Sequence, residues 1–301
     1  MNNDYLQVTL HRLRELWIHT GTACNLECPF CLEGSRPGDT RLERFKLNEI
    51  KPHLDAAVEL GVERFCFTGG EPLIVKDIVK VLEYALNLKP CLILSNGTAP
   101  LLKRLHQLQL LKQQTHALSF RISIDYPDQQ RHDTARGWGN FQRALDGLQL
   151  LHEQGFAISI ARQTDLDENI AAVNEAYRQL LRKLRLPETT PVLALPELGK
   201  LGTDYKLATA IEAPYDSNKL MCSYSRMLLK LDGQLRVHAC AFTDDDPRFD
   251  MGASLRDAGL AAVSLQHQRC RQCVMNSASY SMADESASAT TPRRPVDVNQ
   301  N

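Results

Sequence analysis

The sequence predicts an α/β fold, a partial (β/α)6 barrel of the TIM type followed by a small C-terminal module. Short apolar runs alternate with segments of helical periodicity as far as residue 195, and that rhythm has stopped by about residue 215. Such alternation implies parallel strands joined by right-handed crossovers. A complete eight-unit barrel usually needs about 250 residues, so the six units found here indicate a partial barrel.

Six apolar runs are predicted as strands, at residues 16–20, 64–68, 91–95, 119–125, 157–162 and 191–195. Helical segments lie between them, with apolar residues three and four apart on one stripe. The first carries Leu47, Ile50, Leu54 and Val58 and stops at Gly61, and the second carries Ile74, Ile78, Val81 and Tyr84. Two more are predicted at about residues 139–154 and 168–184.

Three regions are expected along the chain: the barrel over residues 1–215, the small module over residues 216–282, and a tail over residues 283–301. The tail is rich in Ser, Ala, Thr and Pro and has no periodicity, which predicts disorder.

Charge and composition exclude several classes of partner. Lys and Arg total 35 and Asp and Glu total 36, so no field of one sign favours nucleic acid or a membrane surface. No apolar run approaches a membrane span, and no secretion signal is evident. We therefore expect a cytoplasmic protein, and in that reducing compartment its nine cysteines are expected to act as metal ligands rather than as disulfides.

The first predicted strand is followed by Cys24-Asn-Leu-Glu-Cys28-Pro-Phe-Cys31. Three thiolates on a four-iron cubane leave one iron open, and the amino and carboxylate groups of S-adenosylmethionine (SAM) can chelate it. The alternative is a structural zinc site with His19 as the fourth ligand. Reactive groups of such barrels gather at the C-terminal ends of the strands, and this loop lies at such an end, which favours the cluster.

The CxxxCxxC segment with Phe30 before its last cysteine, and Gly69-Gly70-Glu71-Pro72 after the second strand, together resemble the radical SAM superfamily. The resemblance continues through 95–97 and 123–137 and covers about residues 14 to 275. It implies an enzyme that reductively cleaves SAM at a [4Fe–4S] cluster to a 5′-deoxyadenosyl radical, which abstracts hydrogen from a substrate.

The resemblance also implies residue roles. Cys24, Cys28 and Cys31 would hold the cluster, the Gly-Gly-Glu segment would hold the methionine amino group, and Arg136 would pair with the methionine carboxylate as a fork. Gly69 and Gly70 would let the backbone approach the ligand closely. As single residues, Ser95, Asn96 and Ser123 could equally be turn or cap residues, and Arg136 could equally be a surface arginine. The expected cofactor contacts are Phe30, Gly69, Gly70, Glu71, Ser95, Asn96, Ser123 and Arg136.

A second cysteine set has the spacing Cys222-x17-Cys240-x29-Cys270-x2-Cys273. Four thiolates would close either an iron–sulfur cluster or a zinc site. The arrangement resembles the twitch domain, a shortened SPASM domain, with a hairpin over 227–238 turning at Asp232-Gly233 and a short helix at 257–263. The resemblance implies an auxiliary cluster, expected to be [4Fe–4S].

The leading functional hypothesis is oxidation of a small molecule or a peptide, in which the auxiliary cluster accepts an electron from the substrate. A reductant such as flavodoxin or ferredoxin would supply electrons to the first cluster. The alternatives are an enzyme that matures a peptide or protein, and a non-catalytic electron carrier. Arg162 and Glu197, at the ends of the last two strands, are the expected catalytic residues. The loop 33–45, with Arg36, Arg41 and Arg44, is expected to be a lid that favours anions, or simply solvated charge.

Overall fold

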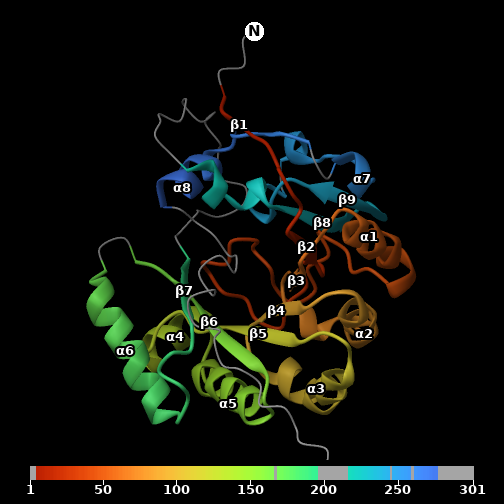
Figure 1. The fold of residues 1–301 in the computed structure, drawn as a ribbon. Helices are drawn as coiled ribbons and strands as arrows, with labels where there is room; N and C mark the ends of the chain where they lie inside the picture. The colour runs from red at the N-terminus through yellow and green to blue at the C-terminus, as the bar shows by residue number, and fades with distance from the viewer. Residues whose placement is uncertain (1–4, 166–167, 196–215, 245, 259–260, 277–301) are drawn as a thin grey trace, which may run out of the picture.

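The computed structural model describes residues 5–165, 168–195, 216–244, 246–258 and 261–276. Over these residues the main sheet has eight strands in the order β7-β6-β5-β4-β3-β2-β8-β9 (Figure 1). All six predicted barrel strands are present and neighbouring strands are parallel. They are β2 (Glu15–His19), β3 (Arg64–Thr68), β4 (Cys91–Ser95), β5 (Leu118–Ser123), β6 (Ala157–Gln163) and β7 (Val192–Leu195).

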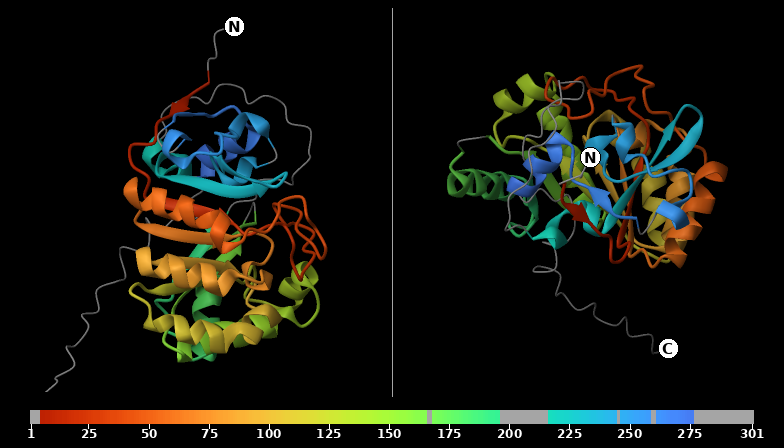
Figure 2. Two further views of the ribbon diagram at one scale, coloured as in Figure 1. Left: turned by 90° about the vertical axis from the view of Figure 1, so that its right-hand side faces the viewer. Right: turned by 90° about the horizontal axis from the view of Figure 1, so that it is seen from above.

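Helices line the outer side of this curved sheet (Figures 1 and 2). They are α1 (Leu47–Glu59), α2 (Ile78–Leu88), α3 (Ala99–Leu110), α5 (Asn140–Glu153) and α6 (Ile170–Lys183), and the short α4 (Gln129–Arg136) follows β5. The second predicted helix starts later than expected, because Pro72–Ile74 forms a 3-10 turn and α2 begins only at Ile78.

Alternation along the strands explains the packing. Leu16 and Ile18 of β2 belong to the large outer core that the helices cover, whereas Trp17 belongs to a separate inner cluster with Cys66 and Leu92. Successive side chains of a strand point to opposite faces, so this division is expected. The inner face is closed near the N-terminal ends of the strands by the buried ion pair Arg64–Glu15, 2.9 Å between Nη2 and Oε1.

Two strands of the C-terminal segment extend the barrel sheet. The predicted hairpin is present as β8 (Ser225–Leu231) and β9 (Gln234–His238), with φ of 49° at Asp232 and 76° at Gly233 as a two-residue type I′ turn requires. Strand β8 runs parallel to β2 and hydrogen-bonds to it. Figure 2 shows this segment stacked as one layer on the β2 end of the barrel.

The remaining elements of this segment are small. They are β1 (Gln7–Val8), which pairs with β10 (Val263–Ser264), the four-residue α7 (Leu255–Ala258) and α8 (Gln268–Asn276), which carries the last two cysteines. The helix expected at 257–263 was therefore misplaced, since Val263 lies in a strand. Glu197 and the tail 283–301 lie outside the described residues. Among the described helices, none has the length and apolar character that a membrane crossing requires.

Candidate active site

A cavity of about 420 Å³ lies at the C-terminal ends of the barrel strands. The cysteine loop forms one wall, and the ends of β3 to β7 form the others. The structure brings together here ten of the residues expected at the site, namely Cys24, Cys28, Phe30, Cys31, Gly69, Gly70, Ser95, Asn96, Ser123 and Arg136. Leu26, Pro29 and Leu32 add apolar surface, and Ala161, Gln163 and Leu195 line the side formed by β6 and β7.

The three thiols of the cysteine loop are partly buried. Burial raises the pKa of Cys24 to about 12 and also raises those of Cys28 and Cys31, an effect that Arg136 partly offsets at Cys28. Thiolates in such a place need a positive centre beside them, which iron supplies. Three sulfur donors that face one cavity fit a cluster with an open iron.

Gly69 and Gly70 dock the cysteine loop onto β3. A Cβ on Gly70 would lie 2.3 Å from the carbonyl oxygen of Ala23, and one on Gly69 would lie 2.7 Å from that of Gly21. The backbone N–H of Gly70 donates to the Gly21 carbonyl at 2.9 Å. The close approach that these glycines permit is therefore between two protein segments, in addition to any approach to a ligand.

Glu71 is buried and does not line the cavity. Its Oε1 accepts from the backbone N–H of Leu73 and the hydroxyl of Ser95, both at 3.0 Å, and its Oε2 accepts from the backbone N–H of Asn96 at 2.8 Å. Burial raises its pKa to about 6 even with these donors, which favour the charged form. Its carboxylate joins the turn after β3 to the end of β4, and direct contact with the cofactor stays a prediction.

Asn96 links the end of β4 to the cysteine loop. Its Nδ2 donates to Asn25 Oδ1 at 2.9 Å and lies 3.9 Å from Cys24 Sγ, and Asn25 in turn donates to the hydroxyl of Thr98 at 3.0 Å. Sequence reasoning missed Asn25 and Thr98, since a single Asn in a loop and a Thr before a helix are common turn and cap residues.

Arg136 already has an anionic partner. Its Nε and Nη2 donate to the two carboxylate oxygens of Asp125, the latter at 3.4 Å, and its guanidinium lies 5.6 Å from the ring centre of Phe30. Although burial lowers the pKa of Arg136, Asp125 raises it above its ordinary value. A ligand carboxylate at Arg136 would therefore meet a guanidinium that Asp125 has already oriented.

Arg162 lies away from the cavity lining. Its side chain is 3% exposed, and its two terminal nitrogens donate to both oxygens of Glu168 at 2.7 and 2.6 Å. The next residue, Gln163, lines the cavity instead. The expected catalytic role of Arg162 thus has no geometric support, and that of Glu197 falls outside the described residues.

The second cysteine set surrounds a small cavity of about 30 Å³. It is lined by Leu220, Met221, Cys222, Cys240, Phe242, Leu265, Arg269, Cys270 and Cys273. Burial raises the pKa of Cys222 and of Cys270 to about 12 and raises that of Cys273 further. Within the described part of the chain, no three His, Cys, Asp or Glu side chains meet closely enough to form the site of a single metal ion.

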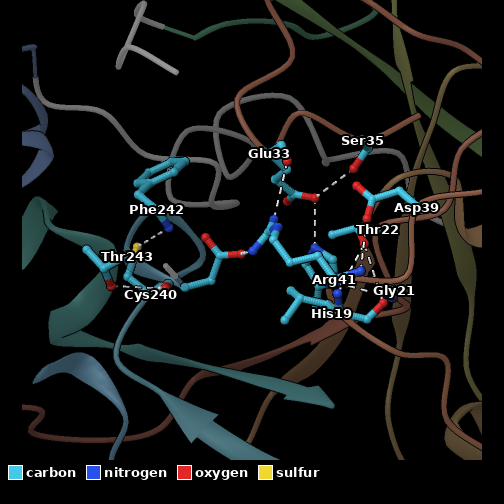
Figure 3. A network of polar contacts seen from close by, with 12 residues as sticks. His19, Gly21, Thr22, Glu33, Ser35, Asp39, Arg41, Cys240, Phe242 and Thr243 are labelled. Carbon is cyan, nitrogen blue, oxygen red and sulfur yellow. Dashed lines mark hydrogen bonds and ion pairs between the residues drawn. The ribbon is translucent and has the colours of Figure 1, made fainter. Parts of the chain in front are cut away.

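A polar network joins the first cysteine loop to the barrel and to the C-terminal segment (Figure 3). His19 Nε2 contacts Glu33 Oε2 at 2.7 Å, and its Nδ1 accepts from the backbone N–H of Gly21 at 3.2 Å. Both ring nitrogens are therefore engaged, which leaves His19 no free nitrogen for zinc. Arg41 donates to the Glu33 carbonyl at 3.2 Å and to Asp244 Oδ2 at 3.0 Å.

Comparison with known proteins gives one family match. A family model described as the radical SAM superfamily matches residues 18–180, more than half of the chain. The chain is 30% identical over 144 residues to the AdoMet-dependent heme synthase of Oleidesulfovibrio alaskensis, a match that covers 46% of the chain and 35% of that protein.

The chain is also 31% identical over 140 residues to the antilisterial bacteriocin subtilosin biosynthesis protein AlbA of Bacillus subtilis, covering 46% of the chain and 30% of AlbA. It thus spans about a third of the length of each of these relatives. Among solved structures, Streptococcus suis SuiB bound to its precursor peptide SuiA superposes with a TM-score of 0.62 at 13% identity, over 81% of the chain and 63% of SuiB. At that identity the likeness concerns the fold.

Proposed function

Because the chain belongs to the radical SAM superfamily, we propose that it is an enzyme holding a [4Fe–4S] cluster through Cys24, Cys28 and Cys31, with SAM beside that cluster. When bound, these groups supply reductive cleavage of the sulfonium and abstraction of a hydrogen atom from the substrate. The observation that carries the proposal is that the three cysteines and the ends of five strands line one cavity.

The residues of the chain hold the cysteine loop in place, bind SAM and keep water out of the cavity. Asn25 and Asn96 fix the cysteine loop against β4, and Glu71 fixes the β3 turn against the same strand. Arg136 presents a guanidinium that suits the methionine carboxylate. Phe30 and Leu26 cover the cavity with apolar surface, which keeps water from reactive groups.

We further propose that Cys222, Cys240, Cys270 and Cys273 hold an auxiliary iron–sulfur cluster of a twitch or SPASM-like type. The four thiols line one small cavity, and its volume of about 30 Å³ is too small for an organic substrate. A closed cluster suits one-electron transfer, so we propose oxidation of the substrate with the auxiliary cluster as electron acceptor and flavodoxin or ferredoxin as external reductant.

The substrate is proposed to be a small molecule or a peptide. Similarity to AlbA, whose name describes biosynthesis of a bacteriocin, favours a peptide and makes maturation of a peptide the second candidate function. The cavity sides formed by Ala161, Gln163 and Leu195 lie farthest along the sheet from β2, and we propose that the substrate enters there.

The deciding experiment is anaerobic reconstitution with iron and sulfide, followed by dithionite and SAM. We expect about eight irons per chain, as two clusters require, and release of 5′-deoxyadenosine. The triple variant Cys24→Ala/Cys28→Ala/Cys31→Ala is expected to retain about four irons and release no nucleoside. Zinc in place of iron, or an intact first cluster without nucleoside release, would leave an electron carrier or a structural metal site instead.

Product analysis tests for net oxidation. Oxidation of a small molecule gives a product two mass units lighter than its substrate, and so does oxidation of a side chain or an internal cross-link in a peptide, so the substrate that is converted separates the two candidates. A product of unchanged mass would count against oxidation of the substrate but not against cleavage of SAM.

A further inference from the structure

We propose that Arg41 and Asp244 are positioning residues that hold the first cysteine loop against the Cys240 loop, so that SAM binding at one site changes the electronic state of the cluster at the other. This inference rests on the proposed function, because it requires both clusters. It assigns to Arg41 a role other than the anion-binding lid that its loop position predicted.

Arg41 is the link between the two loops. Its Nη2 donates to the carbonyl oxygen of Glu33, two residues after Cys31, and its Nη1 donates to Asp244 Oδ2, four residues after Cys240. Figure 3 shows the Arg41 guanidinium between Glu33 and the loop after β9 that carries Cys240. One planar guanidinium with donors on two sides suits this bridging geometry.

The charged form of Asp244 depends on its ion pair with Arg41. Its side chain is 1% exposed, whereas that of Arg41 is 35% exposed. Burial, and then the nearby Glu33 carboxylate, raise the pKa of Asp244, and Arg41 opposes that rise. A buried carboxylate that loses its cation is strongly destabilised, so separation of the Cys240 loop from Arg41 would cost free energy.

The segment from Cys240 to Asp244 is held from its other side as well. The Arg269 guanidinium, adjacent in sequence to Cys270, donates to the carbonyl oxygen of Phe242 at 3.0 Å. Within the segment, the backbone N–H of Phe242 donates to Cys240 Sγ at 3.4 Å. Arg41 and Arg269 thus hold a short segment whose own amide bonds to a proposed cluster ligand.

An apolar contact supports the same connection. Leu32, next to Cys31, packs against the inner cluster that contains Met221 and Phe242, and Cys240 packs against that cluster too. Leu32 also lines the large cavity. A ligand that displaces the cysteine loop therefore presses on the residues that position the Cys240 sulfur.

Hydrogen bonds to cluster sulfurs and solvent exposure set the reduction potential of an iron–sulfur cluster. A shift of the Phe242 N–H relative to Cys240 is thus a direct route from SAM binding to the auxiliary potential. Asp244 and Arg41 transmit the shift because they are fixed to opposite loops.

The test is an anaerobic redox titration of the full reconstituted protein, followed by electron paramagnetic resonance with and without SAM. The auxiliary signal is identified from the Cys24→Ala/Cys28→Ala/Cys31→Ala variant, which retains only the second set. We expect SAM to change the reduced-to-oxidised ratio of that signal at fixed potential by about threefold or more in the wild type. Asp244→Asn removes the buried charge together with the ion pair, and it is expected to abolish the change while iron content and folding persist. Arg41→Gln is expected to abolish the change too, with a loss of stability because it leaves Asp244 without its cation.

Two variants serve as controls. Arg41→Lys keeps a cation opposite Asp244 and should retain part of the response. Arg236→Gln breaks the ion pair to Asp250 at 2.9 Å, which lies within the C-terminal segment and does not involve the cysteine loop, and it should respond as the wild type does. A response as large in Arg41→Gln as in the wild type would overturn the inference. So would a wild type that holds both clusters and does not respond to SAM.

Iron content separates these outcomes from failure of the proposed function. A wild-type protein with about four irons and no second signal would remove the auxiliary cluster itself, and the inference with it.

Discussion

Glu71 and Asn96 tie together the ends of two adjacent strands, with 2.8 Å between the Glu71 Oε2 and the backbone nitrogen of Asn96. The carboxylate accepts from three donors in all, two of them backbone N–H groups. In Glu71→Gln an amide NH₂ replaces one acceptor and faces a donor. We expect a loss of about 1–3 kcal/mol in the free energy of unfolding, measured in urea on the metal-free protein.

Ser95→Ala is the control, because it removes the hydroxyl that donates to Glu71, and accepts from the Gly97 N–H at 3.1 Å, without placing donor against donor. It should cost about 1 kcal/mol. Equal urea midpoints for Glu71→Gln and the wild type would show that the carboxylate does not support the fold.

Arg136 is expected to bind SAM through its fork of donors. Arg136→Lys keeps the charge and loses the planar fork, so SAM affinity of the reconstituted protein should fall about tenfold or more in equilibrium dialysis. Asp125→Asn removes the competing anion and should leave affinity at or above that of the wild type. Weaker binding in Asp125→Asn would mean that orientation of Arg136 by Asp125 outweighs competition.

Arg162 is expected to stabilise the fold through its ion pair with Glu168. Arg162→Ala leaves the largely buried Glu168 without its cation, which typically costs about 3–5 kcal/mol. The exposed pair Arg131–Asp165, at 2.7 Å, provides the comparison, and Arg131→Ala should cost less than about 1 kcal/mol. Urea unfolding of both variants measures this; similar small losses in both would restore Arg162 as a candidate for the reaction.

His132 is expected to make the fold sensitive to acid. It is fully buried, both ring nitrogens have no hydrogen-bond partner among the described residues, and burial followed by Arg136 lowers its pKa to about 4. The unfolded value is about 6.5, so between pH 6.5 and 4 the unfolded chain binds a proton that the folded chain does not. The free energy of unfolding should therefore fall as pH falls through this window, by up to about 3 kcal/mol from this group.

His132→Leu removes that contribution, since leucine fills a similar volume without titrating. The difference in stability between pH 7.5 and pH 5 should shrink in the variant, measured on metal-free protein. His238, whose pKa burial also lowers, stays in both proteins and accounts for a residual dependence. An unchanged pH difference would mean that the His132 pKa is not lowered in the folded chain.

Cys270→Ala/Cys273→Ala is expected to separate the two clusters in function. Loss of two of four ligands should remove about four irons, while cleavage of SAM continues at the first cluster. The oxidised product should disappear, because its electron acceptor is gone. Continued formation of that product at the wild-type rate would exclude the second set as the acceptor.

The barrel was predictable because its signals are local. Each strand is a short apolar run, and parallel strands necessarily place their C-terminal ends together, so the sequence alone predicts Ser95, Ser123 and Gly70 at one edge. Helix α4 escaped prediction because its sequence, Gln-Gln-Arg-His-Asp-Thr-Ala-Arg, has no apolar stripe; it is fixed by capping at Asp128 and by contacts to α5.

Relationships between distant residues were not predictable. Arg41 and Asp244 are 203 positions apart, and an arginine in a polar loop carries no signal of which carboxylate it meets. The pairing of β8 with β2 was likewise hidden, since β8 looks like any strand of a hairpin. The Arg162 assignment failed to gain support for a related reason: sequence places it at a strand end but does not show that Glu168 lies within reach of its side chain.

The pairing of β8 with β2 also protects the barrel. Strand β2 lies between β3 and β8, so without the segment from residue 216 onward its backbone N–H and C=O groups would form an open edge from Glu15 to Ile18. Open, apolar edges are templates for pairing with another chain. A chain cut before residue 216 would therefore be prone to self-association, and removal of the proposed auxiliary cluster would carry the same hazard if it loosened the segment that covers this edge.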